Sequence, residues 1–353
     1  MTSKERMHVA LSHEEPDRVP LDMWITPEVR DRLMAETGAK DVWEMRVALG
    51  HDCLMAFVGL VASFYLSEEP RYVDPWGITW ARMPYADGKG SYTEMVVHPL
   101  AGDDSLLDSY RAPDPDEPRQ YEELAMLIRR FGKTHSIVGG VSSSVFEGPW
   151  YLRGMDQFLQ DMLLNKDYAH TLIDIVADFH LKAGLRLVRM GCDILLAGDD
   201  VGTQDRMLIS PELFREFIKP RYGKLFDEYK RANAELKIAA HICGYIEPVI
   251  DDLVEVGLDV LNPVQPLAMD PARLKRRYGK RLSFWGAVDD QKVMPFGSPA
   301  EVEEEVRLRI AQLAPGGGYI LCPSHNIQPT TPMENVRAYY RAAEKYRDYP
   351  LKV

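Results

Sequence analysis

The sequence predicts a (β/α)8 barrel, an α/β fold formed as a single domain over residues 1–353. Three observations favour it: eight short apolar runs typical of buried strands, a helix-length segment after most of them, and no Gly-x-Gly-x-x-Gly turn after the first strand. A doubly wound open sheet is the competing architecture. The missing glycine-rich turn and the count of eight strands favour the closed barrel.

The first strand and its helix have clear boundary signals. The strand is predicted over residues 19–25 (VPLDMWI), and the following helix begins at Thr26 and Pro27. Thr26 is a capping residue and proline fits the first helical turn. Gly38 is then expected to end the helix.

An insertion follows the second predicted strand, which starts at Cys53. Residues 74–85 and 91–100 alternate apolar and polar side chains around Asp87-Gly88, a pattern typical of a β-hairpin. The sequence therefore predicts a β-excursion after the second strand of the barrel.

The remaining strands alternate with helices, as parallel pairing requires. They are predicted to start near Ser136, Asp193, Leu236, Asp259, Leu282 and Gly317. The helices are predicted over Glu122–Arg130 and Tyr151–Met190 and after the starts at Ser210-Pro211-Glu212, Ser298-Pro299-Ala300-Glu301 and Thr331-Pro332-Met333-Glu334.

Composition limits the class of protein. The chain is 46% hydrophobic and 27% charged, which is typical of a globular protein, and its net charge of -12 argues against nucleic-acid binding. No apolar run reaches the roughly 18 residues of a membrane helix, and the N-terminus lacks a signal-peptide core, so we expect no membrane partner and a cytoplasmic location. Four scattered cysteines predict free or metal-bound thiols.

Polar residues follow the predicted strands, where the loops of a barrel meet at one mouth. The sharpest signal is His241-x-Cys243, because residues two apart at the end of a strand face the same side, and imidazole with thiolate suits zinc. Cys322 and His325 follow the eighth strand and can face the same mouth. His241, Cys243 and either of these two would make a zinc site with one open position. The alternative is a half-buried histidine beside an inert core thiol.

Three acids near the mouth are candidate catalytic residues. Asp199 and Asp200 could be metal ligands, a general base or substrate anchors, although two adjacent residues face opposite ways. Glu147 could orient a ligand or line the pocket. A polar turn and a solvated loop glutamate are the alternative interpretations.

Four further residues are candidates for substrate binding because they lie on the same predicted rim. Trp150 follows the third strand, Gln265 the sixth and Asn326 the eighth. Trp285 lies near the end of the seventh strand, where barrel core is the competing interpretation.

Six motifs occur in order along the second half of the chain: Gly198-Asp199-Asp200-Val201-Gly202, Ser210-Pro211-Glu212-Leu213-Phe214, His241-Ile242-Cys243-Gly244, Asp259-Val260-Leu261-Asn262-Pro263-Val264-Gln265, Gly317-Gly318-Tyr319-Ile320-Leu321 and Thr331-Pro332-Met333-Glu334-Asn335. With these motifs the chain resembles, over nearly its whole length, the uroporphyrinogen decarboxylase superfamily, whose fold is a (β/α)8 barrel.

The resemblance favours one branch of that superfamily. The heme-pathway decarboxylases carry an Arg-Gln-Ala-Gly-Arg segment near the first strand, which binds substrate carboxylates, whereas this chain has Val19-Pro20-Leu21-Asp22-Met23-Trp24 there. The zinc-dependent corrinoid methyltransferases carry His-x-Cys, matched here by His241 and Cys243, and a later third ligand that is usually cysteine. Alignment on Ile327-Gln328-Pro329 puts His325 at that position and leaves Cys322 three residues earlier. Either residue could be the third ligand.

The resemblance thus implies a zinc-dependent methyltransferase that moves a methyl group between a small-molecule donor or thiol and cobalamin on a separate corrinoid protein. In that interpretation Asp199, Asp200, Glu147, Gln265 and Asn326 shape the small-molecule pocket. A metal-independent decarboxylase or lyase is the alternative, and a binding protein that has lost the chemistry is a third hypothesis. A homodimer is only the base-rate expectation.

Overall fold

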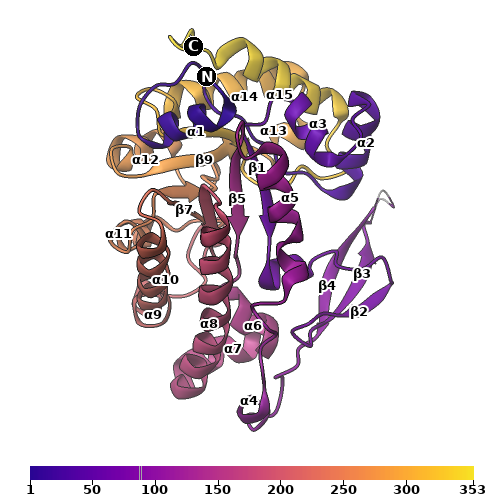
Figure 1. The fold of residues 1–353 in the computed structure, drawn as a ribbon, viewed down its shortest axis with the longest axis vertical. Helices are drawn as coiled ribbons and strands as arrows, with labels where there is room; N and C mark the ends of the chain where they lie inside the picture. The colour runs from indigo at the N-terminus through magenta and orange to yellow at the C-terminus, as the bar shows by residue number, and fades with distance from the viewer. Residues whose placement is uncertain (87, 89) are drawn as a thin grey trace.

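Seven parallel strands form the main sheet of the computed structural model, which describes residues 1–86, 88 and 90–353. The strands run in the order β1 (Cys53–Phe57), β5 (Ser136–Gly140), β6 (Ile194–Ala197), β7 (Lys237–His241), β8 (Val260–Asn262), β9 (Ser283–Val288) and β10 (Tyr319–Pro323). Each strand pairs with the next along the chain, an order that a doubly wound sheet does not have. The fold is therefore α/β with a curled parallel sheet, consistent with a TIM-like barrel (Figure 1).

The first predicted strand differs from the expectation. Residues 19–25 form no regular strand, and their pairing with the β10 side is limited to isolated bridges at Leu21 and Ile25. Pro20 contributes to this irregularity because proline has no N–H to donate to a ladder. The segment nevertheless joins the two edges of the sheet: Leu321 N–H donates to Pro20 O, and Asp52 N–H, just before β1, donates to Leu21 O.

The helices cover the outside of the sheet, except for α1, which lies across the end where the strands begin (Figure 1). They are α1 (Ser3–Leu11), α2 (Pro27–Thr37), α3 (Val42–Ala48), α4 (Leu106–Ser109), α5 (Glu122–Phe131), α6 (Glu147–Arg153), α7 (Met155–Leu164), α8 (Lys166–Met190), α9 (Pro211–Leu213), α10 (Lys219–Ala232), α11 (Ile250–Glu255), α12 (Pro271–Tyr278), α13 (Val293–Phe296), α14 (Pro299–Leu313) and α15 (Met333–Tyr346). Within the described ranges, none of them is both long and apolar enough to cross a bilayer.

The N-terminal caps of four helices can be compared with the residues predicted from the sequence. Ser210 accepts from Leu213 N–H, and Ser298 forms a reciprocal capping box with Glu301, as the sequence predicts. Thr26 takes the cap position of α2 but makes no side-chain capping bond, and Pro332, one residue after Thr331, takes the cap position of α15. Gly38 ends α2 in the left-handed conformation that favours glycine.

Alternate residues of the strands fill the interior of the curled sheet. They form one buried cluster whose strand members are Cys53, Met55, Val138, Ile194, Leu196, Ala239, Val260, Trp285, Ile320 and Cys322. Met7 and Leu11 of α1 close this cluster at the end where the strands begin, and Gly318 N–H, just before β10, donates to Ala10 O. With that end closed, the cavity described below lies at the other end, where the strands finish.

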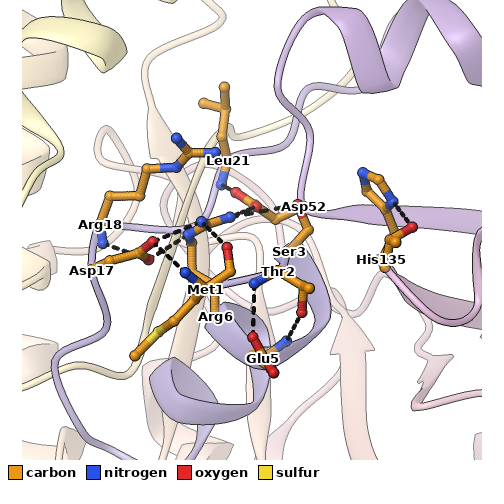
Figure 2. Close-up of polar contacts among 11 residues, drawn as sticks. Met1, Thr2, Ser3, Glu5, Arg6, Asp17, Arg18, Leu21, Asp52 and His135 are labelled. Atoms are coloured by element: carbon orange, nitrogen blue, oxygen red, sulfur yellow. Dashed lines mark hydrogen bonds and ion pairs between the residues drawn. The ribbon is translucent and has the colours of Figure 1, made fainter.

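A buried ion pair holds α1 in place. Figure 2 shows the Arg6 guanidinium between Asp17 and Asp52, with Asp52 fully buried and Arg6 only 3% exposed. The other oxygen of Asp52 accepts from Leu21 N–H at 2.8 Å. One carboxylate therefore connects the N-terminal helix, the irregular segment 19–25 and the start of β1.

A separate antiparallel sheet lies in the chain between β1 and β5. It consists of β2 (Arg71–Val73), β3 (Thr79–Pro84) and β4 (Ser91–Val97), and Figure 1 shows it beside the barrel strands. Of the predicted turn, Asp87 lies outside the described residues. Residues at the β3–β4 end of this sheet form hydrogen bonds with the rest of the molecule. Ser91 N–H donates to Glu28 of α2, and Tyr85 OH donates to Gln328.

Candidate metal centre and cavity

His241 is the last residue of β7 and stands at the mouth because of strand alternation. Ala239, two residues earlier, belongs to the interior cluster, so His241 faces the same side one layer further along. On the neighbouring strand β8, Val260 belongs to the interior cluster and Asn262, two residues later, faces the same side. The parallel register pairs His241 with Asn262. The two side chains therefore meet at the mouth.

Their hydrogen bond sets the tautomer of the neutral imidazole. Asn262 donates from Nδ2 to Trp285 O at 3.1 Å, so its Oδ1 is the atom that faces His241 Nδ1, at 2.6 Å. Because a carbonyl oxygen only accepts, Nδ1 carries the proton and Nε2 keeps its lone pair. Nε2 lies 3.3 Å from the sulfur of Cys243. This is the arrangement of a metal-binding histidine whose second nitrogen is held by the protein.

Three side chains bring potential ligand atoms together here. Those of His241, Cys243 and His325 lie within 4.8 Å of one another, and each residue is half-buried. Burial lowers the pKa of His325 to about 4, with a further lowering by His241, so its imidazole is neutral at pH 7. Burial and the neighbouring Asp200 carboxylate raise the pKa of the Cys243 thiol. A cation would offset that effect by stabilising the thiolate.

The donor set fits zinc. Imidazole and thiolate groups are typical zinc ligands, and the ligand atoms of a tetrahedral zinc stand roughly 3.5 Å apart. The 3.3 Å between His241 Nε2 and Cys243 Sγ is close to that spacing. Three protein ligands would leave one coordination position open to a substrate.

Cys322, the other candidate third ligand, is placed in a different layer. It lies within β10, two residues after Ile320, and both side chains belong to the interior cluster. Its thiol is 1% exposed, and burial followed by the Asp22 carboxylate raises its pKa well above the ordinary value. His325 comes two residues after the strand ends, and its imidazole packs edge to face on His241 at 5.4 Å.

A cavity of about 960 Å³ opens beside these ligands. His241, His325 and Asp200 line it at the barrel mouth, and Tyr92 and Thr93 of β4 line it on the side of the antiparallel sheet. Eight of its 28 lining residues are Phe, Trp or Tyr, whereas these types make up 10% of the chain. The cavity can therefore hold a small, largely apolar molecule.

The two adjacent aspartates have different surroundings. Asp199 is fully buried and accepts from the backbone N–H groups of Val145, Phe146 and Glu147 at the start of α6 and from Tyr222 OH. Burial raises its pKa to about 6 against these hydrogen bonds. Asp200 lines the cavity and accepts from Cys243 N–H at 2.7 Å. Asp199 therefore holds the α6 helix, while Asp200 faces the candidate metal centre.

Glu147 lines the cavity next to two hydroxyl groups. Tyr151, one turn later on α6, donates its hydroxyl to Glu147 Oε1 at 2.9 Å, and Ser143 Oγ donates to Oε2 at 3.4 Å. Burial raises the pKa of Glu147 well above its ordinary value, and the negative charges of Asp200 and Asp199 raise it further.

Of the four residues expected to bind substrate, one lines the described wall of the cavity. Asn326 lines the cavity, whereas Trp150, Gln265 and Trp285 are absent from its described wall. Gln265 accepts from Gly244 N–H and so holds the loop after Cys243. Trp285 is fully buried in the interior cluster, and Trp150 packs edge to face on Tyr151.

Several residues of the site escaped the sequence interpretation. Trp24 lines the cavity and stacks on His241 with ring centroids 5.0 Å apart. No local signal indicated this, because residues 19–25 lie far from His241 in the chain. Asn262 and Tyr151 had usable signals: Asn262 ends the strand next to that of His241, and Tyr151 follows Glu147 at helical spacing.

Comparison with known proteins identifies the family. The model of the uroporphyrinogen decarboxylase (URO-D) family matches residues 82–346, about three quarters of the chain. The chain belongs to the URO-D family. This confirms the resemblance inferred from the sequence motifs.

The curated URO-D relatives include enzymes of two kinds. Methylcobamide:CoM methyltransferase MtaA from Methanosarcina barkeri is 24% identical over 233 residues, which cover 65% of this chain and 64% of the relative. A uroporphyrinogen decarboxylase from Prochlorococcus marinus is 25% identical, covering 72% of this chain and 71% of the relative. Among solved structures, a methyltransferase from Methanosarcina mazei matches with a TM-score of 0.73 and 22% identity, covering 98% of this chain and 99% of that one. This last match supports the fold.

Proposed function

We propose that this URO-D protein is a zinc-dependent methyltransferase that moves a methyl group between a small molecule and the corrinoid of a separate protein. One observation carries the proposal: His241, Cys243 and His325 bring three ligand atoms within 4.8 Å of one another beside a large cavity. The methylcobamide:CoM methyltransferases among the relatives support this assignment over other zinc chemistry.

The three side chains would hold the metal, with His325 as the third ligand in place of Cys322. Zinc, when bound, supplies a Lewis acid that polarises a methyl donor or lowers the pKa of a thiol. Asn262 keeps Nε2 of His241 free for the metal. Asp200 holds the backbone at Cys243, and Asp199 positions the α6 helix that carries Glu147.

The test is the metal content of protein purified without added metal, measured by elemental mass spectrometry. We expect about one zinc per chain, lost in Cys243→Ser and in His325→Ala, because each change removes one of three ligands. Cys322→Ser is the matched control and should keep its zinc. Loss of zinc in the Cys322 variant with retention in His325→Ala would make Cys322 the third ligand, and no zinc uptake by the wild type would refute the proposal.

The zinc-loaded protein should then methylate cob(I)alamin from a small-molecule donor, or demethylate methylcobalamin with a thiol. Chelation should abolish this activity, and added zinc should restore it. Activity of Cys243→Ser equal to that of the wild type would contradict the role of the metal centre.

A metal-independent decarboxylase is the second candidate. Two observations favour it: the decarboxylases among the relatives, and Arg30 and Arg46 in the cavity wall, whose guanidinium groups could take substrate carboxylates. Release of carbon dioxide from a polycarboxylate substrate, undiminished after chelation, would establish this candidate and displace the first.

A further inference from the structure

Trp24 lies at the mouth of the curled sheet although its segment forms no regular strand. The backbone of the segment is held against the β10 side, where Asp22 N–H donates to Leu321 O. Past the end of β10, Ile327 N–H donates to Trp24 O. The indole stands in the cavity wall and stacks on His241, with ring centroids 5.0 Å apart and planes inclined by 27°. A side chain from the start of the chain therefore covers one face of a candidate metal ligand.

Three contacts fix the indole of Trp24 in one orientation. His241 stacks on its face, and the ring of Trp285 meets it edge to face at a centroid distance of 5.9 Å. Its N–H donates to Asp22 Oδ2 at 2.9 Å. Trp285 and Asp22 are both fully buried, so neither can move away without disturbing the packed interior. The indole is therefore a rigid plate beside the imidazole.

Asp22 is a buried charge whose cost stability alone does not explain. Its Oδ1 lies 3.0 Å from His51 Nδ1 and 3.5 Å from a guanidinium nitrogen of Arg46. Burial raises the pKa of Asp22, but the His51 hydrogen bond and the Arg46 charge lower it by more, so the carboxylate is ionised at pH 7. Buried ion pairs add little net stability compared with apolar side chains of the same volume. The other oxygen, Oδ2, holds the N–H of Trp24, which gives this charge a task besides stability.

The stacking adds a restraint on His241 that its hydrogen bond does not supply. A single bond from Nδ1 to Asn262 Oδ1 sets the tautomer, but the ring can still turn about the line between these two atoms. The direction of the Nε2 lone pair depends on the ring plane. With Trp24 on its face, Nε2 stays directed at the space that it shares with Cys243, whose sulfur is 3.3 Å away. Outer contacts of metal-binding histidines commonly orient the ring in this way.

We propose that Trp24, anchored by Asp22, is a positioning residue of the metal centre. It holds the ring plane of His241 so that Nε2 is directed at the metal before the metal binds, and this raises the affinity for zinc. Trp24 itself supplies no ligand atom, because the indole N–H only donates and is already bonded to Asp22. The inference deepens the proposed function and rests on it.

The zinc affinity of two Trp24 variants tests the proposal. Trp24→Leu removes the ring that stacks on His241, and we expect the zinc dissociation constant to rise about 10- to 100-fold. Trp24→Phe keeps an aromatic face but loses the hydrogen bond to Asp22, so the rise should be smaller. Trp24 is only half-buried, and both variants should therefore fold. Titration against a competing fluorescent chelator measures the dissociation constants.

The chain contains a matched control for this side chain. Trp80 of β3 also donates its indole N–H to a buried aspartate, Asp74, at 2.9 Å. Trp80 is fully buried in the antiparallel sheet and is absent from the described wall of the cavity. Trp80→Phe should lower the free energy of unfolding of the metal-free protein at least as much as Trp24→Phe does, measured by urea denaturation. Its zinc affinity should equal that of the wild type.

A second readout needs no metal. Nitrogen NMR spectra of isotope-labelled imidazoles in metal-free protein report which ring nitrogen carries the proton and how mobile the ring is. We expect His241 to be protonated at Nδ1 and rigid in the wild type and in Trp80→Phe. In Trp24→Leu the ring should move faster, which weakens the bond to Asn262 and averages the signals of the two nitrogens.

The outcomes separate this inference from the proposed function. Zinc affinity of Trp24→Leu equal to that of the wild type would overturn the inference and leave the proposed function standing. An equal loss of affinity in Trp24→Leu and Trp80→Phe would reduce the effect to general destabilisation and also overturn it. A wild type that takes up no zinc, while its His241 ring depends on Trp24 in the NMR spectra, would contradict the proposed function instead.

Discussion

At the scale of single residues, one hydrogen bond decides which ring nitrogen of His241 is held by the protein and which faces Cys243. The amide of Asn262 is oriented by Trp285 O, and that orientation gives His241 a carbonyl acceptor at Nδ1. Trp24 stacks on the same imidazole, and Asp22 holds the indole N–H of Trp24 at 2.9 Å. The ring is therefore held at its edge and on its face before any metal arrives, which reduces the entropy lost on binding.

Removing this acceptor should weaken metal binding without removing a ligand. In Asn262→Ala, His241 Nδ1 loses its partner, the imidazole can rotate and change tautomer, and we expect zinc affinity to fall about 10- to 100-fold. Competition with a chromophoric chelator measures the change. Asn326→Ala is the control, because Asn326 lines the cavity but makes no hydrogen bond to the three ligands in the described structure. Equal affinities in the two variants would contradict a positioning role for Asn262.

At the scale of elements, the ends of β6 and β7 approach each other so closely that one position requires glycine. Gly198, directly after β6, has a φ of +129°, and a Cβ built there would lie 2.0 Å from the backbone oxygen of His241. Backbone atoms cannot move aside as a side chain can. The packing of two neighbouring strand ends thus positions His241 and the loop that carries Asp199 and Asp200.

We expect Gly198→Ala to displace the end of β7 and to lose zinc. Gly191→Ala is a matched control: its φ of +101° carries a similar backbone strain, about 1–2 kcal/mol, but a Cβ there meets no atom within 4 Å. Denaturation midpoints and zinc content measure both effects. The Gly191 variant should be mildly destabilised and retain its metal. If Gly198→Ala keeps one zinc per chain, the close approach between Gly198 and the backbone of His241 is not needed for zinc binding.

At the scale of the whole molecule, the two ends of the curled parallel sheet are built differently. At the closed end, α1 and the buried Arg6–Asp52 pair connect the N-terminus to the strands (Figure 2). At the mouth, the loops carry His241, Cys243 and His325 beside the cavity. Stability and chemistry concentrate at opposite ends of such barrels, because the loops after the strands vary while the layers beneath them stay packed.

Arg6→Ala should therefore reduce stability while leaving the metal centre intact. It leaves the fully buried Asp52 without its cation, which costs about 3–5 kcal/mol. Arg231→Ala, which removes two exposed ion pairs on α10, should cost less than about 1 kcal/mol for each pair. Urea denaturation measures the difference, and zinc content of the folded protein should match the wild type in both variants. Equal stability of the two variants would show that the Arg6–Asp52 ion pair contributes nothing to the free energy of unfolding.

Local patterns in the sequence were enough to predict most of the framework. Continuous apolar runs marked the strands of the parallel sheet, capping signals such as that of Ser298 marked helix starts, and alternation at the end of β7 put His241 and Cys243 on one side. These features depend on residues near one another in the chain, so spacing alone reveals them. The irregularity of residues 19–25 was missed, because their apolar pattern outweighed the effect of Pro20.

Only the tertiary structure separated Cys322 from His325 and assembled the rest of the cavity. Both residues follow the same apolar run, but Cys322 still alternates into the packed interior, whereas His325 lies past the strand end and packs on His241. Trp24, Tyr151 and the aromatic wall from the antiparallel sheet come from distant segments. The sequence by itself identified His241, Cys243, Cys322 and His325 as candidate metal ligands. Their contacts depend on the register and curvature of the sheet, which residues far apart in the chain create together.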